Sequence, residues 1–259
     1  MRAPSRSIAV HLILLGGLLL AVRPLSAQTG GWRPDERVLI TDFGFVTALA
    51  RSPTTVFAAT AGGLIAVDEA RGRSEPPITV EDGYPPVAPT AMAYDHRDRT
   101  LWLAAAGDLV QFDPFSRRFR DRIRVGRGVT GLVPAESSGS DLFVRVGAEW
   151  WRVDTFSRDL RRADPAAVRR AIDSRSDLRD RDEALRDPFF LDGAEQAARP
   201  WSGQRVRILD ITPALDAYGW WLGTAGAFLL RYDAIGRSVT RNSIGPAGVG
   251  MASVVATED

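Results

Sequence analysis

The chain contains few residues of the types that carry out catalysis. Beyond the first 27 residues, His96 is the sole histidine, and it lies in the charged run 95–99, where we expect an exposed turn residue and not a catalytic base. There is no cysteine and no lysine. These two gaps exclude disulfides, thiolate zinc sites, a cysteine nucleophile and Schiff-base chemistry.

Carboxylates and serines are plentiful, but their spacing does not define an active site. Asp180, Asp182 and Glu183 lie together in a charged segment with helical composition, which indicates a solvated helix face. The serines lack the glycine-flanked pattern of a nucleophile elbow. The sequence therefore predicts no catalytic residue, no metal site and no cofactor.

Aromatic side chains are the better candidates for binding. Two tryptophan doublets occur, at 150–151 and 220–221, and successive residues of a strand point to opposite faces. One ring of each doublet is expected to pack inside the protein, which leaves Trp150 and Trp220 as candidates for binding a sugar or a peptide. Phe189 and Phe190, in an apolar trio that ends at Leu191, form a second candidate pair.

These aromatic residues belong to a repeat that occurs four times. In each copy, an aromatic residue in one apolar run is followed by a turn, a second apolar run and an aspartate. The spacing is 11 residues in three copies and 12 in the fourth. The four pairs are Phe57 and Asp68, Trp102 and Asp113, Phe143 and Asp154, and Trp221 and Asp233.

Each copy contains about four short strands joined by tight turns. Repeats of roughly 40 residues with four strands each are typical of a β-propeller. The first strand of a blade lies in the crowded centre, and small residues such as Ala48, Ala91 and Gly131 occur there. We therefore predict an all-β propeller with blades at about 46–80, 89–121, 129–162 and 206–241.

The aspartate at the end of each third strand opens a polar turn. A turn-opening aspartate accepts hydrogen bonds from backbone amides two or three residues later. Since the other ligands of a hard cation are absent nearby, we interpret these aspartates as turn caps.

The period breaks between the third and fourth copies. Residues 164–198 are rich in aspartate, arginine, alanine and glutamate, and Pro165 follows Asp164 as a first-turn proline follows an N-cap. This composition predicts a helical insertion with helices at 165–172 and 176–186. We expect it to form a small cap over one propeller face; a degenerate blade is the alternative.

The two ends of the chain differ from the repeats. Two arginines, an apolar run from Ile8 to Val22 and small residues before Gln28 indicate a secretory signal over 1–27. Residues 28–36 read as a flexible lead-in, and 38–41 as a strand. The run 249–259 resembles the start of a further, partial blade, so the ring is either incomplete or closed by pairing of this run with 38–41.

Charge narrows the range of partners. When the three arginines of the signal are removed, 30 of the 33 basic residues remain, against 32 acidic residues. This near-neutral balance argues against nucleic acid as a partner. No segment after the signal could span a membrane, so the mature chain is expected to be periplasmic or extracellular in a bacterium.

The repeat resembles the two-component-regulator propeller repeat, within the WD-repeat and YVTN-like superfamily of β-propellers. Copy four matches best, in Trp221-Leu222-Gly223-Thr224, Gly226 and Arg231-Tyr232-Asp233. The resemblance covers residues 46–259 apart from the insertion. It implies a propeller of a kind found in extracytoplasmic sensors and in exported proteins without a kinase, and this chain contains no kinase motif.

Together these features favour an exported, non-enzymatic propeller that binds or senses an unknown protein, peptide or carbohydrate. An extracytoplasmic propeller lyase or hydrolase is the enzymatic alternative. A third interpretation is a structural N-terminal fragment of a larger envelope or sensor protein.

Overall fold

A computed structural model describes residues 43–126, 128–135, 141–198, 206–216 and 218–242. The chain divides into two units, Met1–Ile40 and Thr41–Asp259, and all described residues belong to the second. The predicted signal 1–27, the lead-in 28–36, the strand 38–41 and the partial blade 249–259 lie outside them.

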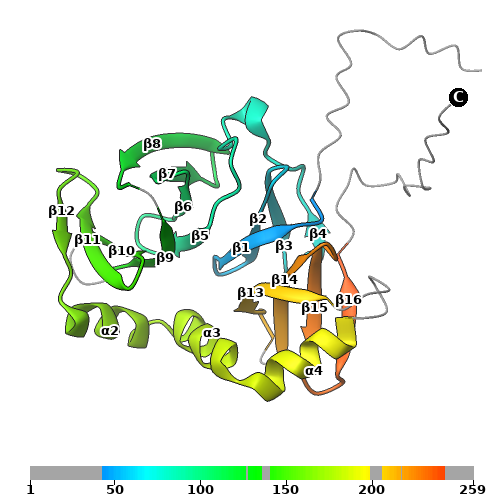
Figure 1. Cartoon of the computed structure of the whole chain (residues 1–259). Coiled ribbons are helices and arrows are strands. Elements are labelled where there is room, and N and C mark those ends of the chain that lie inside the picture. The colour runs from blue at the N-terminus through cyan, green and yellow to red at the C-terminus, as the bar shows by residue number, and fades with distance from the viewer. Residues whose placement is uncertain (1–42, 127, 136–140, 199–205, 217, 243–259) are drawn as a thin grey trace, which may run out of the picture. The chain divides into compact units, whose positions relative to one another are not determined.

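The described residues form four antiparallel sheets of four strands, each in simple sequence order (Figure 1). We number these blades along the chain. Blade 1 contains β1 (Val46–Arg51), β2 (Thr55–Thr60), β3 (Leu64–Asp68) and β4 (Arg73–Ser74). Blade 2 contains β5 (Ala91–Asp95), β6 (Thr100–Ala105), β7 (Asp108–Asp113) and β8 (Arg118–Arg124). Blade 3 contains β9 (Val129–Pro134), β10 (Asp141–Val146), β11 (Glu149–Asp154) and β12 (Leu160–Arg162). Blade 4 contains β13 (Arg207–Pro213), β14 (Gly219–Ala225), β15 (Leu229–Asp233) and β16 (Ser238–Arg241).

The aromatic residue of each repeat occupies an equivalent register position on the second strand. Phe57, Trp102, Phe143 and Trp221 pair with the first-strand residues Ala50, Ala93, Val133 and Thr212. All four aromatic side chains are buried. A propeller-like all-β fold with a helical insertion, as the repeat predicted, follows from these sheets.

The first strands of the blades lie side by side in the order β13, β1, β5, β9. Equivalent threonines join three of the blades at this inner edge. Thr47 donates to the Pro89 carbonyl, which precedes β5 (2.6 Å), and Thr90 donates to the Val129 carbonyl of β9 (2.5 Å). The apolar cores lie between successive sheets.

Three helices connect blade 3 to blade 4: α2 (Pro165–Asp173), α3 (Ser176–Arg186) and α4 (Pro188–Ala198). Asp164 caps α2 by accepting from the Ala166 amide (3.0 Å), as expected from the sequence. The sequence prediction did not include α4 as a separate helix. Pro188 ends α3 and also supplies a first-turn proline for α4, and the Asp187 carboxylate accepts from the Phe189 amide (2.9 Å).

The helices cover the blade faces that no neighbouring sheet covers. Val168 and Ala171 of α2 pack on blade 3 against Val133 and Phe143. Ala194 and Ala198 of α4 pack on blade 4, together with Phe190, which lies against Trp220 and Tyr232. The insertion thus packs along the sides of two blades, and not as the expected cap over one end of the strands.

Helix α3 joins this segment to the inner strands through buried charges. Arg175, just before α3, donates to the Tyr94 carbonyl of β5 (2.7 Å). Arg181 pairs with the buried Asp210 of β13 (2.7 Å), whose second oxygen accepts from the Leu49 amide of β1 (2.7 Å). These bonds link the helices to three blades at once.

Candidate functional site: the turn face

Two kinds of strand connection lie at the same end of each blade. Because neighbouring strands run antiparallel, the links between first and second strands emerge at the same end of a blade as the links between third and fourth strands. We call this end the turn face.

Each third-to-fourth-strand turn is held by its aspartate. Asp113 accepts from the Phe115 amide (3.0 Å), Asp154 from the Phe156 amide (2.9 Å) and Asp233 from the Ile235 amide (2.9 Å). In blade 1 Asp68 accepts from the Arg71 amide (3.0 Å). The carboxylates therefore act as turn caps.

These turns leave an apolar side chain in water at the same place in three blades. Phe115 is 99% exposed, Phe156 is 91% exposed and Ile235 is 69% exposed. A turn tip of this kind needs no large apolar side chain for folding. Phenylalanine is enriched in protein interfaces relative to the rest of the protein surface.

In blades 2 and 3, the arginine two residues later bonds the turn to the preceding blade. Arg117 has a left-handed backbone (φ 55°) and donates to Glu75 (2.5 Å) and to the Pro76 carbonyl (2.6 Å) of the blade 1 strand edge. Arg158 (φ 63°) donates to Asp121 of blade 2 (3.0 Å). The exposed phenylalanines therefore lie on turns that are held by the capping aspartate on one side and by the arginine's bond to the preceding blade on the other.

A groove of about 500 Å³ opens on the turn face between blades 4 and 1. Its lining mixes apolar, charged and amide side chains: Val67, Glu69, Gly72, Leu215, Asp216, Trp221, Arg231, Thr240, Arg241 and Asn242. Leu215 and Tyr218, in the first turn of blade 4, are 51% and 61% exposed.

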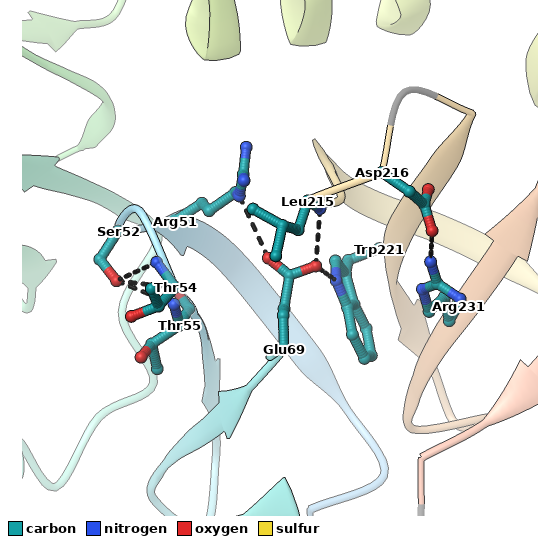
Figure 2. A network of polar contacts seen from close by, with 9 residues as sticks. All are labelled: Arg51, Ser52, Thr54, Thr55, Glu69, Leu215, Asp216, Trp221 and Arg231. Atoms are coloured by element: carbon teal, nitrogen blue, oxygen red, sulfur yellow. Dashed lines mark hydrogen bonds and ion pairs between the residues drawn. The ribbon is translucent and has the colours of Figure 1, made fainter. Parts of the chain in front are cut away.

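Glu69 holds the two walls of this groove together (Figure 2). Its carboxylate accepts from the Trp221 indole nitrogen (2.8 Å) and the Leu215 amide (2.9 Å), both in blade 4, and from Arg51 Nε (3.1 Å) of blade 1. The side chain of Glu69 is 4% exposed. Three donors compensate the burial of its charge, so this carboxylate is a structural link.

Asp216 and Arg231 form an ion pair beside Glu69, also visible in Figure 2. Arg241 lies over the Phe228 ring, with its guanidinium carbon 3.9 Å from the centroid. The lining of the groove thus includes two arginines: Arg231 is paired with Asp216, and Arg241 stacks on Phe228.

A second, smaller groove of about 220 Å³ opens at the equivalent place between blades 1 and 2. Ser52 and Thr54 of the first blade 1 turn line one wall, and Pro114, Phe115 and Arg117 of the blade 2 turn line the other. Ser52 Oγ accepts from the Thr55 amide (2.9 Å), which makes this wall a compact turn. Exposed Phe115 stands at the rim of the groove.

The four candidate binding residues from the sequence do not come together in one site. Phe190 and Trp220 are in contact, with ring centroids 5.1 Å apart, as part of the packing of α4. Phe189 is 89% exposed at the start of α4. Trp150 lies half-buried near α2 on blade 3.

Sequence reasoning missed the exposed turn residues. The signal was the repeated Phe-Ser-Arg at 115–117 and 156–158, each two residues after the capping aspartate. His96 is exposed in its turn and lies against Tyr94, with the rings 5.1 Å apart. No cluster of three or more histidine and carboxylate side chains that could hold a metal occurs in the described part of the chain.

No protein-family model matches the chain, and no curated protein sequence matches it. Solved structures with some similarity include hydrazine synthase of Kuenenia stuttgartiensis, with 13% identity over 82% of this chain and 52% of that one, at a TM-score of 0.41. The WD40 repeats of RRP9 have 16% identity over 48% and 39%, at 0.40. The extracellular domain of BT4673 from B. thetaiotaomicron has 10% identity over 78% and 21%, at 0.37.

The chain spans about half or less of the length of these proteins. Likeness at this level carries no argument about function. The class of protein, a β-propeller-like fold with a helical insertion, rests on the chain's own sheets and helices. Among the described residues, no helix is long and apolar enough to cross a bilayer.

Proposed function

We propose that this protein is an exported, non-enzymatic interaction module that binds a protein partner through its turn face. The observation that supports it is the set of exposed apolar side chains at Phe115, Phe156 and Ile235, placed at equivalent turns of three blades. Export is supported by the signal-like first 27 residues.

A protein fits this surface better than a carbohydrate does. The apolar side chains project from turn tips, so a partner must supply pockets for them, and protein interfaces pair such anchors with pockets. A carbohydrate site needs an accessible aromatic face beside polar groups, and the Trp221 ring in the larger groove is buried.

The charged residues of the interior support the non-enzymatic part of the proposal. Glu69, Asp141 and Asp210 are buried carboxylates, and each is paired with an arginine. A carboxylate that acts as a general acid or base must lie within hydrogen-bond reach of the substrate. These three carboxylates instead link strands, blades and helices.

The test places a photo-crosslinking amino acid, benzoylphenylalanine, at Phe115 and at Phe156 in the producing cells. We expect cross-links to one protein from both positions. Matched controls are Val80 and Val87, which are 53% and 52% exposed in the connection from β4 to β5, at the opposite end of the strands.

The double variant Phe115→Ser and Phe156→Ser completes the test. Since both side chains are exposed, it should melt within about 2 °C of the wild type, as surface substitutions usually change stability by less than 0.5 kcal/mol. It should also lose the partner. Equal cross-linking from Val80 and Val87, or unchanged partner capture by the double variant, contradicts the proposal.

A further inference from the structure

Helix α2 lies beside blade 3 (Figure 1). A separate cleft lies between them, on the face of blade 3 that no other sheet of the described residues covers. Its volume is about 590 Å³. The apolar part of its lining is Phe143, Ala163, Ala167 and Ala171. A cleft of this size suits a small molecule, because pockets for such ligands measure about 300–1,000 Å³.

Arginines dominate the polar part of the lining. Arg152, Arg161, Arg162 and Arg170 face two carboxylates, Asp141 and Asp164. Asp141 is buried and paired with Arg152 (2.6 Å), and Asp164 caps α2. The lining residues therefore carry a formal charge of +2, but Arg161 and Arg162 also pair with Asp159 and Glu149, which lie outside the lining. The side chains of the four arginines are 52–78% exposed.

Two of these arginines lie directly opposite each other. Arg152 on β11 pairs in register with Arg161 on β12, so both side chains project from the same face of the sheet. Like charges directly opposite each other in a sheet are destabilising. Asp141 and Asp159 each offset one of these charges, and an anion between the two guanidiniums would reduce the remaining repulsion.

Other blades do not share this arrangement. The position of Arg152 is occupied by Ala66 in blade 1 and by Gln111 in blade 2. Blade 4 has Arg231 there, opposite the uncharged Thr240 and paired with Asp216. The opposed arginines are thus a feature of the cleft and not of the repeat.

Arg161 and Arg170 both line the cleft, and each has more N–H donors than its ion pair uses. A guanidinium has five N–H donors. Arg161 is bonded to the exposed Asp159 through one nitrogen (3.1 Å), and Arg170 reaches Asp164 at 3.9 Å through one nitrogen. The planar fork of arginine matches carboxylate and phosphate oxygens in pairs.

We infer that this cleft binds a small organic anion with two or more oxyanion groups, such as carboxylates, and an apolar part that lies on Phe143. Arg161 and Arg170, from opposite walls, each contact one oxyanion group. Arg152 stays paired with Asp141 and lines the cleft beside Arg161. The site is independent of the turn face.

Isothermal titration calorimetry of the full chain with citrate tests this inference, at constant ionic strength maintained with sodium chloride. We expect saturable binding with one site per chain. Arg161→Gln and Arg170→Gln should each raise the Kd by about tenfold, the loss expected for a charge-assisted hydrogen bond. Inorganic phosphate, which offers one oxyanion group, should bind more weakly than citrate.

Arg124→Gln is the matched control. Arg124 lies on the outer strand of blade 2, outside the cleft, where it is 71% exposed and pairs with Asp108. It changes the net charge by the same amount and should leave the Kd unchanged. A melting curve of each variant confirms folding before titration. The inference is overturned if citrate does not bind, if Arg124→Gln weakens binding as much as Arg161→Gln, or if phosphate binds as tightly as citrate.

Discussion

At the residue scale, single polar side chains form hydrogen bonds between neighbouring blades. Apolar packing alone does not fix the position of one blade relative to the next. Glu69 connects blade 1 to two donors in blade 4, and Thr47 and Thr90 connect blades 1, 2 and 3 at their inner strands. Hydrogen bonds are directional, whereas hydrophobic contact is not. Such bonds therefore position the turn face more sharply than the cores do.

Tyr84 is a similar case with a measurable consequence. Its ring is buried between blades 1 and 2 and its hydroxyl donates to the Thr60 carbonyl (2.8 Å). Burial raises the pKa of Tyr84 well above its ordinary value, because the phenolate would lose its hydration.

We predict that the free energy of unfolding falls as the pH rises above about 10, the ordinary tyrosine pKa. A group whose pKa is raised by folding contributes stability below its unfolded pKa and loses that contribution as the pH rises towards its folded pKa. Tyr84 alone can add a slope of about 1.4 kcal/mol per pH unit. Urea titrations between pH 8 and 11 measure it.

Tyr84→Phe should flatten this slope, and Tyr218→Phe, at an exposed position, should not. The chain has no lysine, so side-chain amines do not titrate in the same range. An identical slope in wild type and Tyr84→Phe would show that the Tyr84 hydroxyl ionises as readily in the folded protein as in the unfolded chain.

At the element scale, helix α4 depends on one of two adjacent phenylalanines. Phe190 packs against Trp220 and Tyr232, with ring centroids 5.1 and 5.7 Å away, whereas Phe189 is 89% exposed. The helix turns by about 100° per residue, so one ring reaches blade 4 and the other does not.

We predict that Phe190→Ala lowers the free energy of unfolding by roughly 2 kcal/mol or more, since it removes a packed aromatic ring. Phe189→Ala should change it by less than about 0.5 kcal/mol. Urea denaturation of both variants measures the difference. Equal decreases in the free energy of unfolding would mean that a different face of α4 packs on blade 4.

At the scale of the whole molecule, the helical insertion covers the two ends of a row of sheets. Blade 3 carries Arg145 and Arg152 where blade 1 has Ala59 and Ala66. A terminal repeat needs a more polar outer face than an internal one, because no neighbouring repeat buries it. The rest of this face is covered by α2.

We predict that replacing 164–198 with a short glycine-serine bridge abolishes cooperative unfolding. The deletion exposes Phe143 and Tyr232 and leaves the buried Asp210 without Arg181, and an unpaired buried charge typically costs 3–5 kcal/mol. Circular dichroism during thermal and urea unfolding measures the result. A cooperative transition with intact β signal and loss of helical signal alone would restore the interpretation of the insertion as a dispensable cap.

The sequence by itself predicted the strands of the four blades and two of the three helices. The 11-residue spacing from Phe57, Trp102 and Phe143 to their aspartates predicted the sheets, because strand length and turn chemistry are local properties. The composition of 164–198 predicted helices for the same reason. The role of the aspartates as turn caps also followed from residue type alone.

Tertiary structure decided what each element covers and which residues face water. That Glu69 joins two blades, and that α2 closes a cleft over Arg152 and Arg161, depends on contacts between segments that are distant in the sequence. The exposure of Phe115 and Phe156 depends on the absence of any segment that covers them among the described residues. A local pattern shows that a face is apolar but not what buries it. The helices bury blade 3 and blade 4 because these are the two faces that the neighbouring sheets leave uncovered.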